Sequence, residues 1–192
     1  MIFLADQNRE LRIHLDIKNA SISAHCDQVV ALKKHFNHTI RCIGRPHNGN
    51  CVTYALQLLE QNERLCYALQ KYQVRPGSEF VKWLLLQGRL QEVDCEIDGA
   101  LALYFRHNCW RHVGLVSRRG RLVSKWGSYG VFDHQYSEVC SEYGDTLRFF
   151  APINSAKAVE YFFEFGCGPL NLPAKEVESL AALLKSDRED DP

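Results

Sequence analysis

The sequence lacks the marks of several large classes of protein. Its 23 basic side chains are matched by 23 acidic ones, and a formal net charge of zero argues against a nucleic-acid-binding protein that works through a broad basic surface. No apolar run reaches the roughly 18 residues of a membrane-spanning helix. The start of the chain has no basic segment and its apolar stretch ends at Asp6, which predicts no secretory signal peptide. We therefore expect no nucleic-acid partner and no membrane span.

Cysteines are present but lack the spacing of a metal or disulfide framework. The eight make up about 4% of the 192 residues, well under the roughly 8–10% of a disulfide scaffold. No Cys-x-x-Cys occurs and no two cysteines are closer than nine residues, which excludes the paired ligands of a zinc ribbon or knuckle. Without an export signal we expect reduced thiols in a cytosol-like compartment. Most should then be small core side chains, and the question is whether one of them is a nucleophile.

The pattern of apolar residues predicts one α+β domain. Residues 10–18 alternate strictly between apolar and polar and predict a half-buried strand. Farther along, the spacing predicts helices over 27–36, 51–60, 78–88 and 156–165 and a last one from 173, with strands over 90–95, 100–105, 112–117, 121–126 and 146–150. This order of helices, antiparallel meander and helices is typical of the α+β class. We divide the domain into an N-terminal strand and helix extension (1–40) packed on a core (41–150), C-terminal helices (151–186) and an acidic tail (187–192).

Cys51 stands apart from the other cysteines by its position. It lies in the first turn of the predicted helix 51–60, directly after the polar, turn-forming residues 45–50, and Asn50 is well suited to be the N-cap. The unsatisfied amide N–H groups and the helix dipole at such a position favour a thiolate. The same amides would also face the oxyanion of a tetrahedral intermediate. These features predict that Cys51 is a nucleophile.

His112 is the best candidate for the base that such a nucleophile needs. It opens the predicted strand 112–117, so its ring shares one face of the strand with Gly114, which leaves room for a ring or a substrate. A three-residue hairpin at 118–120 would pair Ser117 with Arg121. His112 would then lie opposite Trp126.

Ser124 is the first candidate for the third group, the one that orients the imidazole. In the register of that hairpin it is a diagonal neighbour of His112 on the same face of the sheet. A competing interpretation of the same region is a metal site made by His107, Cys109 and His112, although it has no obvious fourth ligand.

Three short segments, taken together in their order and spacing, resemble the NlpC-type branch of the papain-like cysteine hydrolases. They are NCVTYAL at 50–56, GALALY at 99–104 and HVGLV at 112–116. In that family a Cys opens a helix, a Gly-led strand follows, and the His begins the next strand. The resemblance covers roughly residues 45–150. It implies a papain-like NlpC-type fold, in which the helix that bears the nucleophile packs on an antiparallel β-meander.

The resemblance also implies roles for individual residues. Cys51 would be the nucleophile and His112 the general base and then acid. The third position falls on Ser124, with Asp133, His134 or a backbone carbonyl as alternatives. Around the nucleophile, the family's usual Asp-Cys-Ser-Gly is replaced here by NCVT at 50–53.

Three residues are expected to contact the substrate: Asn50, Trp126 and His134. The implied reaction is hydrolysis of an amide or peptide bond through an acyl-enzyme, without a cofactor, with muropeptides as the first substrate class. Since no signal peptide is expected, we predict either a cytoplasmic enzyme or a toxin delivered by a specialised secretion system, and a toxin would have an immunity protein as partner. The alternative is a non-catalytic binding module on the same fold.

Overall fold

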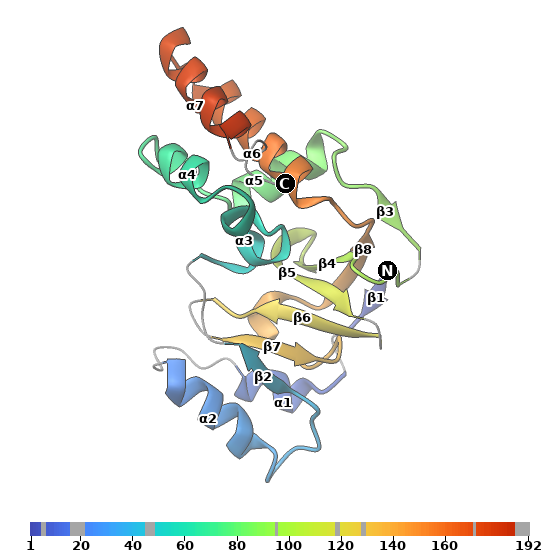
Figure 1. The fold of residues 1–192 in the computed structure, drawn as a ribbon. Helices are drawn as coiled ribbons and strands as arrows, with labels where there is room; N and C mark the ends of the chain where they lie inside the picture. The colour runs from blue at the N-terminus through green and yellow to red at the C-terminus, as the bar shows by residue number, and fades with distance from the viewer. Residues whose placement is uncertain are drawn as a thin grey trace.

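An eight-stranded antiparallel sheet runs through the centre of the protein, with helices on both of its faces (Figure 1). The computed structural model describes residues 1–4, 7–15, 22–44, 49–94, 96–117, 120–127, 130–170 and 172–186. Helices and an antiparallel sheet in one chain confirm the predicted α+β class.

The strands follow the order β1-β8-β4-β5-β6-β7-β2 across the sheet, and β3 also pairs with β8. Their bounds are β1 Ile2–Phe3, β2 Arg41–Gly44, β3 Glu92–Val93, β4 Leu101–Arg106, β5 Cys109–Ser117, β6 Arg121–Lys125, β7 Val131–His134 and β8 Thr146–Phe150. The pairing of Ser117 with Arg121 is the one that the sequence predicts. Strands β1, β2 and β7 were not predicted, and they are short.

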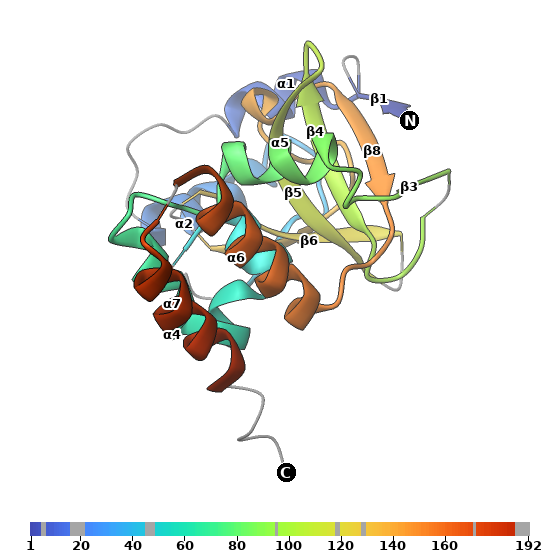
Figure 2. The ribbon, with the colours of Figure 1, turned by 90° about the horizontal axis from the view of Figure 1, so that it is seen from above.

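The helices divide between the two faces of the sheet. They are α1 Arg9–His14, α2 Ile22–Leu32, α3 Cys51–Ala55, α4 Leu58–Gln70, α5 Ser78–Leu86, the 3₁₀ helix η1 Ser141–Tyr143, α6 Ser155–Leu170 and α7 Ala174–Ser186. Helices α3 to α7 lie on one side of the sheet, and α1 and α2 lie on the other (Figure 1). Figure 2 shows α4, α6 and α7 packed side by side over the first of these faces. None of the helices in the described ranges is long and apolar enough to cross a membrane.

Two hydrophobic cores result, one on each face of the sheet. The core on the α3 face includes Val52, Leu65, Phe80, Leu103, Val113 and Phe162. The core on the α1 face includes Leu4, Leu11, Tyr104, Val116, Trp126 and Phe132. Consecutive strand residues contribute to opposite cores, because side chains alternate across a strand. Both faces of the central strands are therefore buried.

The predicted strand over 10–18 is wrong where the structure describes it, because residues 9–14 form helix α1. Leu11 and Leu15 are four positions apart and are both buried in the core on the α1 face, whereas Ile13 is 55% exposed. A spacing of four places two side chains on one side of a helix. The same residues satisfy the two-residue period of a strand, so packing against the core decides between the two. Residues 16–18 lie outside the described part of the chain.

Three of the predicted helices are divided or differ from the structure by more than two residues at one end. Helix α2 begins and ends earlier than the predicted 27–36. The predicted 51–60 is divided at Gln57, whose φ of 52° is left-handed, so that α3 ends and α4 begins there. Helix α6 continues through Gly166, the predicted end, to Leu170. A Cβ at Gly166 would lie 2.7 Å from Leu69 Cδ2, so this glycine allows α6 to pack closely on α4.

Candidate functional site

Asn50 caps helix α3, as predicted, and so orients Cys51 in the first turn. Its Oδ1 accepts hydrogen bonds from the N–H groups of Val52 (2.9 Å) and Thr53 (3.1 Å), and its own N–H donates to Thr53 Oγ1 (2.8 Å). Its Nδ2 donates to the carbonyl of Pro76 (2.7 Å). Both ends of the amide are thus engaged within the protein. The predicted substrate contact by Asn50 would have to break one of these bonds.

The surroundings of the Cys51 sulfur differ from those that the helix start predicts. Cys51 packs against the core on the α3 face, where α3 lies over β5 and β6. Burial raises the pKa of its thiol, and it outweighs the lowering effect of the backbone N–H groups of Val113, Cys51 and Val52 and of the charge on Lys125. The resting group at neutral pH is therefore the thiol. Because Val52 and Thr53 already donate to Asn50, they do not form the predicted oxyanion hole.

Lys125 is a member of this site that sequence reasoning missed. It is 1% exposed and ends strand β6 on the α3 face, since Ser124 and Trp126 beside it lie on the α1 face. Burial lowers the pKa of its ammonium group, while the nearby Cys51 acts to raise it. The sequence did contain a signal for Lys125, because alternation along β6 places it on the opposite face from its two neighbours. To use that signal, one must also know which face of the sheet α3 covers.

His112 lies on the opposite face of the sheet from Cys51, so the structure does not form the predicted dyad. Its ring stacks on Tyr143 at 3.9 Å between centroids and also approaches Tyr104 at 5.8 Å, in the core on the α1 face. The next residue, Val113, is the one that faces α3. Burial, and secondarily His134, lowers the pKa of His112 well below its ordinary value, so the ring is neutral. Among the described residues its Nε2 has no hydrogen-bond partner.

Ser124, Trp126 and His134 are brought together, but in the core and not in a cleft. Trp126 Nε1–H donates to Ser124 Oγ (2.9 Å), which is 2.8 Å from His134 Nε2. His134 Nδ1 lies 2.8 Å from the carbonyl of Gln135, which can only accept, so Nδ1 carries the proton and Nε2 accepts from the serine. None of the three side chains is more than 1% exposed. They therefore form a buried series of hydrogen bonds with a structural role. The predicted substrate contacts of Trp126 and His134 do not fit this placement.

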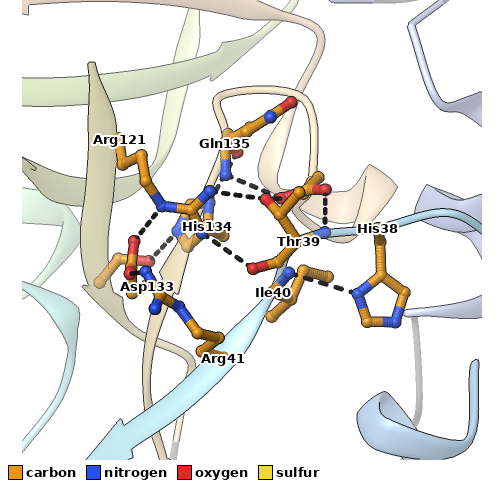
Figure 3. Close-up of polar contacts among 10 residues, drawn as sticks. His38, Thr39, Ile40, Arg41, Arg121, Asp133, His134 and Gln135 are labelled. Atoms are coloured by element: carbon orange, nitrogen blue, oxygen red, sulfur yellow. Dashed lines mark hydrogen bonds and ion pairs between the residues drawn. The ribbon is translucent and has the colours of Figure 1, made fainter. Parts of the chain in front are cut away.

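Asp133, the other candidate for the third role, is engaged in a polar network between β2, β6 and β7 (Figure 3). Its carboxylate binds Arg121 Nε and Arg41 Nη2, the latter at 2.7 Å. Arg121 also donates to Thr39 Oγ1 (2.6 Å) and to the Thr39 carbonyl (2.9 Å). Although burial acts to raise the pKa of Asp133, the two arginines lower it. This network ties the edge strand β2 to the sheet and makes no contact with His112.

The hydrogen-bonded residues Ser124, Trp126 and His134 on the α1 face leave no room beside Gly114. The effect of adding a side chain at Gly114 can therefore be tested. A Cβ at this position would lie 2.9 Å from Ser124 Cβ and 3.3 Å from the Val123 carbonyl. We expect Gly114→Ala to lower the free energy of unfolding by about 2 kcal/mol, because overpacking displaces Ser124 from its hydrogen bonds. Denaturant unfolding measures the change. The matched control is Gly168→Ala in α6, where a Cβ would have nothing within 4 Å; a loss of the same size there would contradict the packing explanation.

The residues of the alternative metal site do not gather in the structure. His107 and Cys109 are exposed at the β4–β5 turn, and His112 is buried in the core. Within the described ranges, no group of three or more His, Cys, Asp or Glu side chains is placed to hold a metal ion.

The structure thus divides the predicted site between the two faces of the sheet. Asn50 and Cys51 belong to the α3 face together with Lys125, whereas His112 and the chain of Ser124, Trp126 and His134 belong to the α1 face. Comparison with family models, with curated proteins and with solved structures finds no match for this chain.

Proposed function

We propose that the protein is a cysteine hydrolase in which Cys51 is the nucleophile and Lys125 is its proton acceptor. One observation carries the proposal: the thiol of Cys51 and the ammonium group of Lys125 lie on the same face of the sheet, and each acts on the pKa of the other. Burial favours the neutral form of both groups. A thiol beside an amine whose pKa is lowered is a pair in which a proton can pass from sulfur to nitrogen, as general-base activation requires.

The reaction is an acyl transfer in two halves. Lys125 Nζ takes the proton from the Cys51 thiol, and the sulfur attacks the carbonyl carbon of an amide. The tetrahedral intermediate collapses to a thioester as the amine leaves with the proton from Lys125. Water then attacks the thioester, releasing the acid and restoring the thiol. The N–H groups of Val113 and of Cys51 itself, which both act on the sulfur, are the candidate donors for the oxyanion.

The substrate class and the papain-like fold are part of this proposal through the resemblance of the three segments to NlpC-type enzymes. That resemblance favours muropeptides as the first amides to test. It is compatible with an enzyme that acts in the cytoplasm and with a delivered toxin that is countered by an immunity protein. The helix that carries Cys51 and its packing over β5 and β6 are the features of the structure that agree with it.

A non-catalytic binding module is the second candidate, and one observation favours it. The histidine that the family uses as its base is 1% exposed on the far face of the sheet. A chain that had lost the hydrolytic reaction while keeping the fold would tolerate this placement. The reactivity of the Cys51 thiol separates the two candidates.

The test measures alkylation of Cys51 by iodoacetamide at pH 8, followed by peptide mass spectrometry. We expect Lys125→Met to slow the reaction at Cys51 by about threefold or more, since it removes both the proton acceptor and the positive charge that lowers the pKa of the thiol. Lys125→Arg keeps the positive charge but cannot accept a proton, so it should be alkylated at Cys51 faster than Lys125→Met and yet fail to restore amide hydrolysis.

Two references are built into the same experiment. The exposed thiol of Cys109 reports reagent activity in every sample, and Lys82→Met removes an exposed lysine of α5 as the matched variant. An unchanged rate at Cys51 in Lys125→Met would rule out the proposed pair. A wild-type Cys51 as inert as the fully buried Cys66 would favour the binding module.

A further inference from the structure

We propose that Cys26 and Cys42 are a redox-active pair that closes to a disulfide. Cys26 lies on helix α2 and Cys42 on the edge strand β2, and their sulfur atoms are 3.0 Å apart. Both are free thiols in the structure. This proposal is independent of the proposed hydrolase, because neither thiol belongs to the site around Cys51.

The pair is accessible, in contrast to the core thiols that the sequence predicts. Cys42 is exposed and Cys26 is partly buried, whereas Cys66 is fully buried. The prediction of core thiols is therefore wrong for Cys42 and also for Cys109, which is exposed. Cys95 lies outside the described residues. An oxidant in solution can reach Cys42 directly.

The local packing holds the two sulfurs against each other. A Cβ at Gly130 would lie 3.2 Å from the sulfur of Cys42 and 3.5 Å from that of Cys26, so the backbone at Gly130 packs against both thiols. Sixteen positions separate the two cysteines along the chain, and no sequence spacing rule marks them as partners. A disulfide bond of about 2.05 Å requires the two sulfurs to approach by about 1 Å from their present separation of 3.0 Å.

The oxidation is a thiol–disulfide exchange with a low-molecular-weight disulfide such as oxidised glutathione. The Cys42 thiolate attacks one sulfur of oxidised glutathione, forming a mixed disulfide and releasing one glutathione thiolate. Cys26 then loses its proton to water and attacks the Cys42 sulfur, which forms the protein disulfide and releases the second glutathione thiolate. Two electrons pass from the protein to glutathione. In the reduced pair, burial and the neighbouring Cys42 raise the pKa of Cys26 to about 12. In the mixed disulfide Cys42 no longer carries a thiol, but burial still raises the pKa of Cys26, so the second step should accelerate with pH.

The disulfide would fasten α2 to the edge of the sheet. In the reduced form, β2 is held by its pairing with β7 and by the network around Asp133. A covalent link between α2 and β2 restricts the opening of both elements. We expect slower hydrogen exchange of the α2 amides in the oxidised protein than in the reduced one.

The experiment incubates the reduced full chain with oxidised glutathione, quenches with an alkylating reagent and maps the disulfides by mass spectrometry. The expected product is a peptide pair joined through Cys26 and Cys42 within one chain. In Cys26→Ser the resolving thiol is absent, so we expect glutathione on Cys42 to accumulate to about ten times its wild-type level. Cys109→Ser is the matched control, because it removes another exposed thiol and should leave the disulfide yield unchanged.

Two outcomes would overturn the proposal. One is a wild-type protein that carries glutathione on Cys42 and Cys109 to similar extents, with no peptide pair joining 26 and 42. The other is a disulfide of Cys42 that forms only between two chains. Since Cys42 is exposed and the wild-type protein itself is tested, neither result depends on a variant that fails to fold.

Discussion

Cys51→Ala should lower the rate of amide hydrolysis by about a thousandfold or more. Without the sulfur no thioester can form, and only binding and oxyanion stabilisation remain. Lys125→Met should cost about a hundredfold or more, which is the usual contribution of a general base. The measurement is release of fragments from muropeptides, followed by mass spectrometry, for each purified variant under identical conditions.

His112→Phe makes this experiment decisive between two mechanisms. Phenylalanine keeps the stacking on Tyr143, and the Nε2 that it removes has no hydrogen-bond partner among the described residues. If Lys125 is the base, the variant should retain most of the activity. If the base is the histidine that the family resemblance implies, activity should disappear in His112→Phe and persist in Lys125→Met. Cys109→Ala is the control for general loss of a thiol, and equal release by wild type and Cys51→Ala would refute the nucleophile.

Acidification from pH 6.5 to pH 4 should lower the free energy of unfolding by about 3 kcal/mol through His134 alone. Burial lowers the pKa of His134 from 6.5 to about 4, and its ring nitrogens are engaged with Ser124 and Gln135 as a neutral tautomer. Each unit of pKa difference between folded and unfolded states is worth about 1.4 kcal/mol. His112, whose pKa is also lowered, adds to the loss in the same direction.

The sign follows from proton binding in the two states. Between the folded and unfolded pKa values, the unfolded chain holds a proton on the imidazole and the folded chain does not. The contribution of His134 to the free energy of unfolding is therefore present in full above pH 6.5, and it decreases as the pH falls toward 4. The carboxylates with lowered pKa, Asp133 and Glu92, titrate below their ordinary values of 3.8 and 4.5 and add their loss at lower pH.

Urea unfolding at a series of pH values measures this slope. His134→Gln removes the titrating group, so its stability should depend on pH less steeply than that of wild type, whatever its stability at pH 7. His107→Gln changes an exposed histidine at the β4–β5 turn and should keep the wild-type slope. An identical slope for wild type and His134→Gln would show that the buried ring does not control acid stability.

Predictions from sequence were correct where a feature depends only on residues that are close together in the chain. The cap at Asn50, the start of α3 at Cys51 and the pairing of Ser117 with Arg121 all depend on neighbours in sequence, and the structure has each of them. They failed at residues 10–15, where the apolar spacing fits both a strand and a helix turn. There the burial of Leu11 and Leu15 against the core on the α1 face decided for the helix.

The sequence by itself determined the α+β class, the central antiparallel strands and the placement of Cys51 at the start of a capped helix. It also separated His112 from Val113, and Ser124 from Lys125, onto opposite faces of their strands, because alternation is a property of the backbone. Only the tertiary structure decided which of these two sets of side chains lies on the same face as Cys51. The central strands are buried on both faces, so both sets are largely apolar and hydrophobicity cannot mark the face that α3 covers. The packing of α3 made that choice, and it joined Cys51 to Lys125 instead of His112.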